Sequence, residues 1–469
     1  MKKIIYSLAL GCLMVVNPGC SGYLDDIEPR HAITQSALTE SDMEKLLNGV
    51  YAKMEYYLYQ LWWNDDIQGE NFATGSGATP MLDPCNMNPS SVSTNTNVLS
   101  YWRNSYSVLY QVNFLLKKYE ESLSKESAVM RKIGSACYYF RAFIYYRLAV
   151  HFGNVPIVDE VSDEIIPISK EAEVWQFVEQ NITNALELSD TQSSKWYVST
   201  DAIKALAARV SLFLGKNTEA ANYADAVLKN SKYELVNTPL NFSSVFLPES
   251  SSKEIIFGYV NNTRTSSYCN FASVVNDTDG SWSYAPSPEC YANLFMDDVS
   301  IKRINDIRHW ATFHQTEANR IIKFSNGTHQ LAVNNDYLHT PVVVSRIAEM
   351  YLIKAEALGK DAGASTLHAF LSKRYDETLS EDEIKALSDR DWQDLILDER
   401  RREFYAEGMR WQDIKRTKRY DLLETLDGRT YLMYYPIPQD EIDIAGKEAY
   451  PQNEGSVSYT HLRAHETDQ

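Results

Sequence analysis

Several patterns that define classes of enzyme are missing from this chain of 469 residues. It contains no GxxxxGK[ST], GxGxxG, HExxH or GxSxG motif, so nothing in it indicates the nucleotide-binding, zinc-protease or serine-hydrolase chemistry that those motifs serve. Its six cysteines include no C-x-x-C pair, which leaves zinc ribbons and redox motifs without support. The sequence therefore predicts a protein that is not an enzyme and that has no cofactor and no metal site.

Positive charge is also in short supply. The chain carries 45 Lys and Arg against 63 Asp and Glu, and its formal net charge is -18. Nucleic-acid-binding proteins gain affinity by neutralising phosphates with Lys and Arg, and electrostatic docking on an anionic membrane needs the same residues. We therefore expect no nucleic-acid partner, and any membrane attachment would have to come from lipid.

The sequence also lacks a long apolar run. The apolar stretch near the N-terminus, residues 4–16, is shorter than the roughly 20 residues that span a bilayer. It follows Lys2 and Lys3, an arrangement typical of a secretory signal. A small residue then precedes Cys20, which resembles a bacterial lipobox, although Asn17 stands where an aliphatic residue is usual.

This pattern predicts a lipoprotein signal peptide over residues 1–19, lipid attachment at Cys20 and a lipidated tether over residues 20–34. One alternative is cleavage beside Cys12, which would leave an apolar stretch on the mature chain. The other is an ordinary signal peptide with a chance cysteine. Several acyl chains on one cysteine would hold the protein firmly on a membrane, whereas a single chain would hold it weakly.

The most frequent pattern in the sequence is a series of apolar residues at helical spacing. Together they predict a mostly α fold of helix–turn–helix units close in size to tetratricopeptide repeats. A non-repeating helical bundle is the alternative. The helices are expected at residues 41–58, 101–119, 128–153, 174–188, 200–215, 218–230, 345–359 and 364–375.

Two stretches differ from this helical pattern, roughly residues 60–100 and 240–340. Both are rich in Gly, Pro, Ser, Thr and Asn, and residues 254–260 read as a strand. We expect them to form an irregular, loop-rich lobe with a few short strands. Long loops in compact proteins often carry function.

The lobe contains the candidate ligand-binding residues. Aromatic faces hold the C–H faces of sugars, while carboxylates, amides and guanidinium groups bond sugar hydroxyls. Each aromatic residue could instead belong to the core, as large aromatic side chains often do. The candidates are Trp62, Trp63, Asp65, Glu70, Asn71, Trp282, Tyr284 and Trp310.

Motifs along nearly the whole chain resemble the SusD/RagB family of nutrient-binding outer-membrane lipoproteins. The similar stretches occur in family order and are individually modest but together specific. They are "CSGYLDDIEP", "YWRNSYSVLYQVNFLL", "GSACYYFRAFIYYRLAVHFGNVPIV", "SRIAEMYLIKAEA", "ILDERRREFYAEGMRWQDIKR" and "YPIPQDEI".

The resemblance implies a single SusD-like domain over residues 35–455, anchored on the outer face of the outer membrane. It also implies capture of oligosaccharide or polysaccharide and its delivery to a SusC-like TonB-dependent transporter. Two alternatives stay open: a RagB-like lipoprotein that captures peptide, and a non-catalytic scaffold that uses helical repeats to hold proteins. Family ligand sites vary between members, so no ligand-binding residue is carried over.

The C-terminal part carries two further expectations. Residues 398–416 are expected to form a helix with charges paired at i+3, such as Glu399–Arg402 and Glu407–Arg410, on a solvated face, with Phe404 and Trp411 packed inward. Residues 456–469 depart from the family's ending. Most of them resemble a translated transposon-end sequencing adapter, so we expect them to be a non-native tail.

Overall fold

The computed structural model describes residues 38–74, 96–162, 164–190, 194–247, 250–261, 275, 284–316, 320–324 and 340–453. The chain forms two compact units, residues 1–46 and 47–469. In the first unit, only residues 38–46 are described, and they include the first turns of helix α3. Apart from those turns of α3, the elements and contacts below belong to the second unit.

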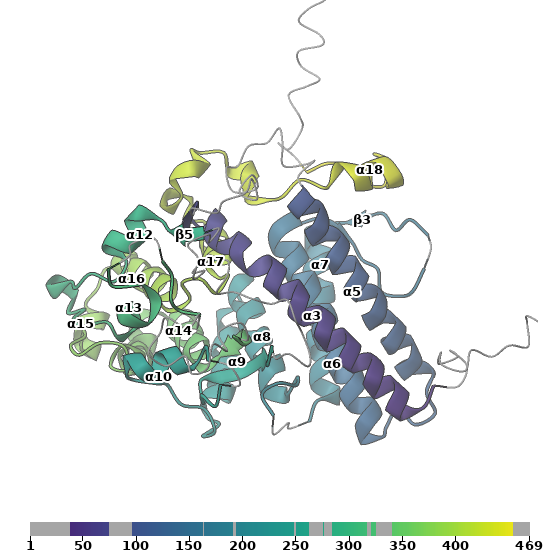
Figure 1. Cartoon of the computed structure of the whole chain (residues 1–469), viewed down its shortest axis with the longest axis horizontal. Coiled ribbons are helices and arrows are strands. Elements are labelled where there is room, and N and C mark those ends of the chain that lie inside the picture. Colours follow the sequence, from purple (N-terminus) through teal and green to yellow (C-terminus); the bar gives the residue numbers. More distant parts are fainter. Residues whose placement is uncertain are drawn as a thin grey trace, which may run out of the picture. The chain divides into compact units, whose positions relative to one another are not determined.

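Helices dominate the described residues, which confirms the predicted mostly α fold (Figure 1). The helices of eight or more residues are α3 (Glu40–Gln68), α5 (Thr96–Glu121), α6 (Ala128–Phe152), α7 (Glu171–Leu188), α8 (Thr200–Phe213), α9 (Asn217–Leu228), α14 (Ile347–Leu371), α16 (Asp389–Glu403) and α17 (Arg410–Thr417). The shorter ones are α10 (Pro239–Ser244), α12 (Pro288–Asn293), α13 (Ile307–Thr312), α15 (Glu381–Lys385) and α18 (Gln439–Ala445).

Consecutive helices pack on one another, α5 on α6, α6 on α7, α7 on α8 and α8 on α9, and α9 then packs on α14. This is the arrangement expected of stacked helix–turn–helix units. Within α14 the backbone leaves the helical conformation at Gly359, where φ is 72°, so two helices meet there. The predicted boundary at this glycine is confirmed.

Helix α6 has no solvent-exposed face over most of its length. Every residue from 133 to 152 is buried, and the charged ones among them have partners in the interior, as Arg147 has in Asp65. Ser127 caps its N-terminus by accepting a hydrogen bond from the Met130 amide. Gly153 ends it at φ 71°, a conformation that favours glycine.

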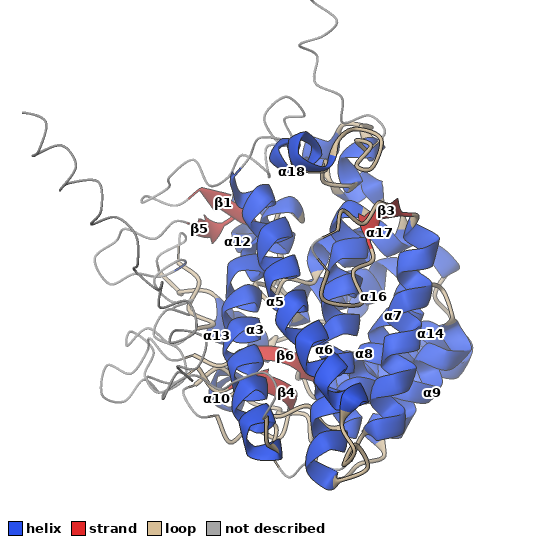
Figure 2. Cartoon of the chain, turned by 90° about the vertical axis from the view of Figure 1, so that its right-hand side faces the viewer, coloured by secondary structure: helices blue, strands red, loops and turns tan. Residues whose placement is uncertain are grey.

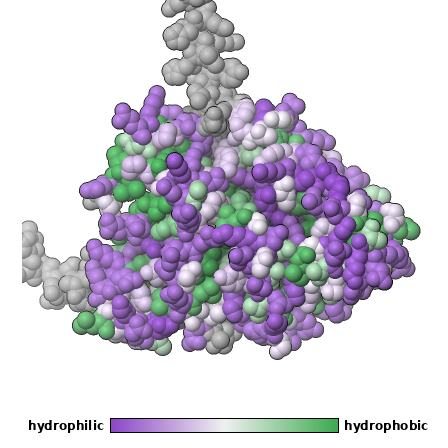
Figure 3. Space-filling model, turned by 180° about the vertical axis from the view of Figure 1, so that it is seen from behind, coloured by the Kyte–Doolittle hydropathy of each residue, from purple (hydrophilic) through white to green (hydrophobic). Residues whose placement is uncertain are grey.

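The strands are short and form three antiparallel pairs, drawn as red arrows in Figure 2. They are β1 (Phe72–Thr74) with β5 (Tyr284–Pro286), β2 (Val155–Pro156) with β3 (Ile168–Ser169), and β4 (Ile255–Tyr259) with β6 (Val342–Arg346). The strand predicted at residues 254–260 is thus confirmed as β4. On the face seen in Figure 3, hydrophilic side chains predominate and apolar ones form scattered patches.

The C-terminal segment corrects one prediction. Residues 398–416 do not form one helix, because α16 ends at Glu403 and α17 begins at Arg410. Ala406 and Gly408, both at positive φ, turn the chain between them. Phe404 and Trp411 are buried, as predicted.

Candidate functional site

The candidate site is built where helix α3 ends. After Gln68, the backbone turns so that the Gly69 amide donates to the Asp65 carbonyl and the Asn71 amide donates to the Asp66 carbonyl. Gly69 is needed here, because a Cβ atom would lie 2.5 Å from Cγ of Arg410. The chain then enters β1.

Strand β1 pairs with β5, and this pairing joins the two stretches from which the predicted lobe was drawn. Phe72 lies opposite Pro286, and Thr74 lies opposite Tyr284. The Ser287 amide extends the pairing by donating to the Asn71 carbonyl. Residues about 210 positions apart in sequence are therefore brought together at one end of α3.

The predicted aromatic residues at this place form one packed cluster. The ring centroids of Trp62 and Trp63 are 6.4 Å apart, and those of Trp63 and Tyr284 are 6.3 Å apart. Phe72 stacks on Tyr284 at 5.9 Å. Trp62, Trp63 and Tyr284 are all buried, with exposed fractions of 7%, 9% and 2%. These buried rings pack together at the end of α3 and the β1–β5 pair.

Asp65 lies in the interior and binds two basic side chains. Its carboxylate is 2.8 Å from Nη1 of Arg147 and 3.0 Å from Nε2 of His151. Burial is the largest single effect and opposes ionisation of Asp65, but the contacts with Arg147 and His151 together outweigh it and lower the pKa of the carboxyl. Burial lowers the pKa of His151 to about 4, so at neutral pH the imidazole lies beside Asp65 without carrying charge.

Asn71 and Glu70 connect the end of α3 to the C-terminal part of the chain. Nδ2 of the Asn71 side chain donates to Oδ1 of Asp66 at 2.7 Å, and Oδ1 of the same side chain accepts from Nε of Arg401 at 2.8 Å. The Glu70 carboxylate accepts from the backbone amides of Glu424 and Thr425 at 3.0 and 2.7 Å. The Glu70 side chain therefore holds neighbouring backbone in place, and the Asn71 side chain links Asp66 to Arg401.

Two of the remaining predicted residues are tryptophans, and Cys20 is the third. Trp310 is half-buried in the short helix α13. Trp282 and Cys20 lie outside the described residues, as do the signal peptide, the tether and the tail. Cys290 is a buried free thiol whose Sγ accepts from Nη2 of Arg401 at 3.0 Å.

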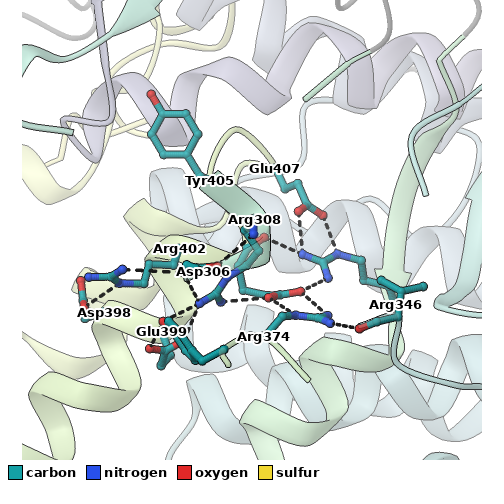
Figure 4. Close-up of polar contacts among 12 residues, drawn as sticks. Asp306, Arg308, Arg346, Arg374, Asp398, Glu399, Arg402, Tyr405 and Glu407 are labelled. Carbon is teal, nitrogen blue, oxygen red and sulfur yellow. Dashed lines mark hydrogen bonds and ion pairs between the residues drawn. The ribbon is translucent and has the colours of Figure 1, made fainter. Parts of the chain in front are cut away.

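Next to this region lies a buried network of charged side chains that the sequence did not indicate (Figure 4). Glu403 is at its centre and accepts from Nη1 of Arg308 at 3.0 Å and from Nε of Arg374 at 2.9 Å, and it also binds Arg346. Glu254 binds Arg346 and Arg374 from the other side, at 3.2 and 2.8 Å. All five side chains are essentially inaccessible to solvent.

This network corrects the predicted i+3 pairs on a solvated face. Glu399 is fully buried and binds Arg303 and Arg308 at 2.8 and 2.9 Å. Glu407 binds Arg346 and Lys323 at 2.7 and 2.6 Å. The partners come from distant parts of the chain, so helical spacing could not reveal them.

The described residues contain no group of three or more His, Cys, Asp or Glu side chains placed to hold a metal ion. An interior cavity of about 70 Å³ beside Trp62 and Glu407 is well below the roughly 300–1,000 Å³ of typical ligand pockets. A groove of about 390 Å³ at the α6–α7 connection is within that range. No helix in the described ranges is long and apolar enough to cross a membrane.

Comparisons with known proteins agree with this architecture. Residues 22–212 match a family model described as "Starch-binding associating with outer membrane", and residues 310–428 match the model of the SusD family. The chain is therefore a member of the SusD-like family.

Individual relatives are similar to most of the chain. It is 25% identical to SusD-like protein P2 of Formosa agariphila, over 89% of this chain and 91% of that protein. The crystal structure of a SusD superfamily protein from Bacteroides thetaiotaomicron covers 89% of this chain and all of its own, with a TM-score of 0.74 at 23% identity. A laminarin-binding SusD-like protein has the same fold, with 89% and 100% of the chains covered, a TM-score of 0.67 and 20% identity.

Proposed function

We propose that this protein captures oligosaccharides or polysaccharides at the outer face of the outer membrane and delivers them to a SusC-like TonB-dependent transporter. The observation that carries the proposal is the β1–β5 pair, which draws two loop-rich stretches to one place at the end of α3. One matching family model is described as starch-binding, and one structural neighbour binds laminarin. Both descriptions favour a glycan ligand.

In this proposal the residues at the end of α3 have different roles. Trp62, Trp63 and Asp65 are buried and support the surface from inside. Trp282, which precedes β5 by two residues, supplies an aromatic face for sugar rings, and Trp310 is a further candidate. Lipid on Cys20 holds the protein at the membrane.

Glycan binding is tested by affinity electrophoresis of the purified protein in gels containing soluble starch, laminarin or other plant, host and microbial polysaccharides. We expect one class to retard the wild type and Trp282→Ala to lose that retardation. Tyr110→Ala, which removes a 56% exposed aromatic side chain from α5, is the control and should migrate as the wild type does. No retardation by any glycan, together with calorimetric binding of peptides, would replace this proposal with peptide capture.

Anchoring and transporter partnership need separate measurements. Cys20→Ser should move the protein from the membrane fraction to the soluble fraction and abolish labelling with radioactive palmitate. A TonB-dependent transporter should co-purify with the affinity-tagged wild type from detergent-solubilised outer membranes. Purification of the tagged protein without any such transporter would contradict the partnership and favour a scaffold role.

A further inference from the structure

A groove lies at the connection between α6 and α7. None of the residues that line it was selected in the sequence analysis. Its lining includes Gly153, Asn154, Glu171, Tyr431 and Tyr434. Its volume of about 390 Å³ is large enough for a small ligand. The aromatic-rich run "TYLMYYP" at residues 430–436, which the sequence analysis did not select, is the sequence feature that could have indicated this place.

Hydrogen bonds hold the walls of this groove in fixed positions. The Glu171 carboxylate accepts from the hydroxyl of Tyr434 at 2.8 Å and from Nε1 of Trp175 at 3.1 Å. The Glu171 amide donates to Oδ1 of Asn154 at 2.8 Å, which orients that side chain. Gly153 lets the Tyr434 ring approach closely, because a Cβ atom there would lie 2.8 Å from Cε1 of the ring. A site held in this way loses little entropy on binding.

The groove offers the groups that a sugar ring requires. Tyr431 is 36% exposed and presents an aromatic face to solvent. Oε1 of Glu171 accepts from Trp175 and Oε2 accepts from Tyr434, and a carboxylate oxygen can accept a further hydrogen bond from a hydroxyl group. With Oδ1 occupied, the exposed Asn154 has its NH₂ group left to donate, and the Thr430 hydroxyl also lines the groove.

Lys415 fixes the Tyr434 ring in the wall of the groove. Nζ of Lys415 is 3.2 Å from the centroid of this ring and donates to the Val150 and Met433 carbonyls. The Glu171 carboxylate in the groove would repel an anionic ligand, so the groove suits neutral sugar rings better than acidic ones.

The groove is also linked to the end of α3. Glu70 holds the backbone of Glu424 and Thr425 through its carboxylate, and Tyr431 follows six residues after Thr425. Six residues span at most about 22 Å. One oligosaccharide could therefore contact both the α3 end and the groove.

We infer that the Tyr431–Tyr434 groove is a second saccharide-binding subsite, which takes neutral sugar rings of a glycan bound at the end of α3. This inference rests on the proposed function and adds to it the place where the far part of the ligand lies. Tyr431 supplies the stacking face, and Asn154 and Glu171 bond ring hydroxyls.

Isothermal titration calorimetry of the purified full-length protein with maltoheptaose and laminariheptaose tests this subsite. We expect Tyr431→Ala to weaken binding about tenfold, as removal of a central aromatic contact does. Tyr431→Phe, which keeps the ring, should stay within about twofold of the wild type. Tyr110→Ala, the exposed tyrosine on α5, should have no effect.

The outcomes separate this inference from the proposed function. If the wild type binds a heptasaccharide and Trp282→Ala abolishes binding while Tyr431→Ala and Asn154→Ala bind as the wild type does, glycan capture stands and the second subsite is wrong. If neither heptasaccharide nor any polysaccharide binds the wild type, the proposed function fails and the subsite fails with it. Binding weakened by Tyr431→Ala but restored by Tyr431→Phe supports both.

Discussion

Replacement of Glu403 by Gln removes the central charge of the buried network while nearly keeping the shape of the side chain. The carboxylate accepts from Arg308, Arg346 and Arg374, and these contacts lower its pKa strongly against the opposing effect of burial. Glutamine has one accepting oxygen, and its NH₂ group would point at guanidinium donors. Removing one partner of a buried ion pair costs roughly 3–5 kcal/mol, so we expect a loss of about 4 kcal/mol.

Differential scanning calorimetry measures this loss. Unfolding entropy is roughly 2.1 cal/mol/K per residue, which gives about 1.0 kcal/mol/K for a protein of this size and a melting temperature lowered by about 4 °C. The control is Glu234→Gln, which breaks an exposed pair with Lys253 at 3.4 Å and should change the melting temperature by less than about 1 °C. If Glu403→Gln melts no lower than Glu234→Gln, the network does not stabilise the fold as argued.

Three further predictions concern helix α3 and the turn that follows it. Gly69→Ala, in that turn, should destabilise the protein by about 2 kcal/mol or more because its Cβ has no room. Gly49→Ala, within α3 and with nothing within 4 Å, should instead stabilise it by roughly 0.5–1 kcal/mol. Equal urea midpoints for the two variants would contradict this. Burial raises the pKa of Glu55 to about 7 from 4.5, so the folded state holds a proton that the unfolded state releases. The free energy of unfolding should therefore fall by up to about 3 kcal/mol as pH rises from 4.5 to 7. Urea unfolding at pH 5 and pH 8 should show a smaller fall for Glu55→Gln than for the wild type. Asp65→Asn should lower the free energy of unfolding by about 3–5 kcal/mol at pH 7, because it leaves Arg147 unpaired. Since the pKa of Asp65 is lowered in the folded state, the difference in unfolding free energy from the wild type should shrink as pH falls below about 4. A difference independent of pH would oppose this reasoning.

Local patterns in the sequence were enough to predict most of the helices. Apolar spacing and capping residues act within a few positions, so α5 to α9 and the break at Gly359 follow from short windows of sequence. The same patterns predicted the single strand β4, because its apolar run is bounded by polar residues.

The candidate site was predictable only in part. Trp62, Trp63, Asn71 and Tyr284 do lie together, but the β1–β5 pair that joins them depends on contacts between distant segments. Composition also could not tell an exposed tryptophan from a buried one, because exposure depends on what packs against the ring. Trp62 and Trp63 are buried, whereas the more exposed Tyr431 lies outside both predicted stretches.

The charged C-terminal motif shows the same division. Its residues were recognised from the sequence and resembled a family signature, and the inward packing of Phe404 and Trp411 followed from apolar spacing. The sequence did not reveal the partners of Glu399, Glu403 and Glu407. These partners are arginine and lysine side chains from segments up to about 95 residues away. Sequence spacing determines which side of a helix a charge lies on, whereas the tertiary structure alone decides whether that side meets water or a buried guanidinium group.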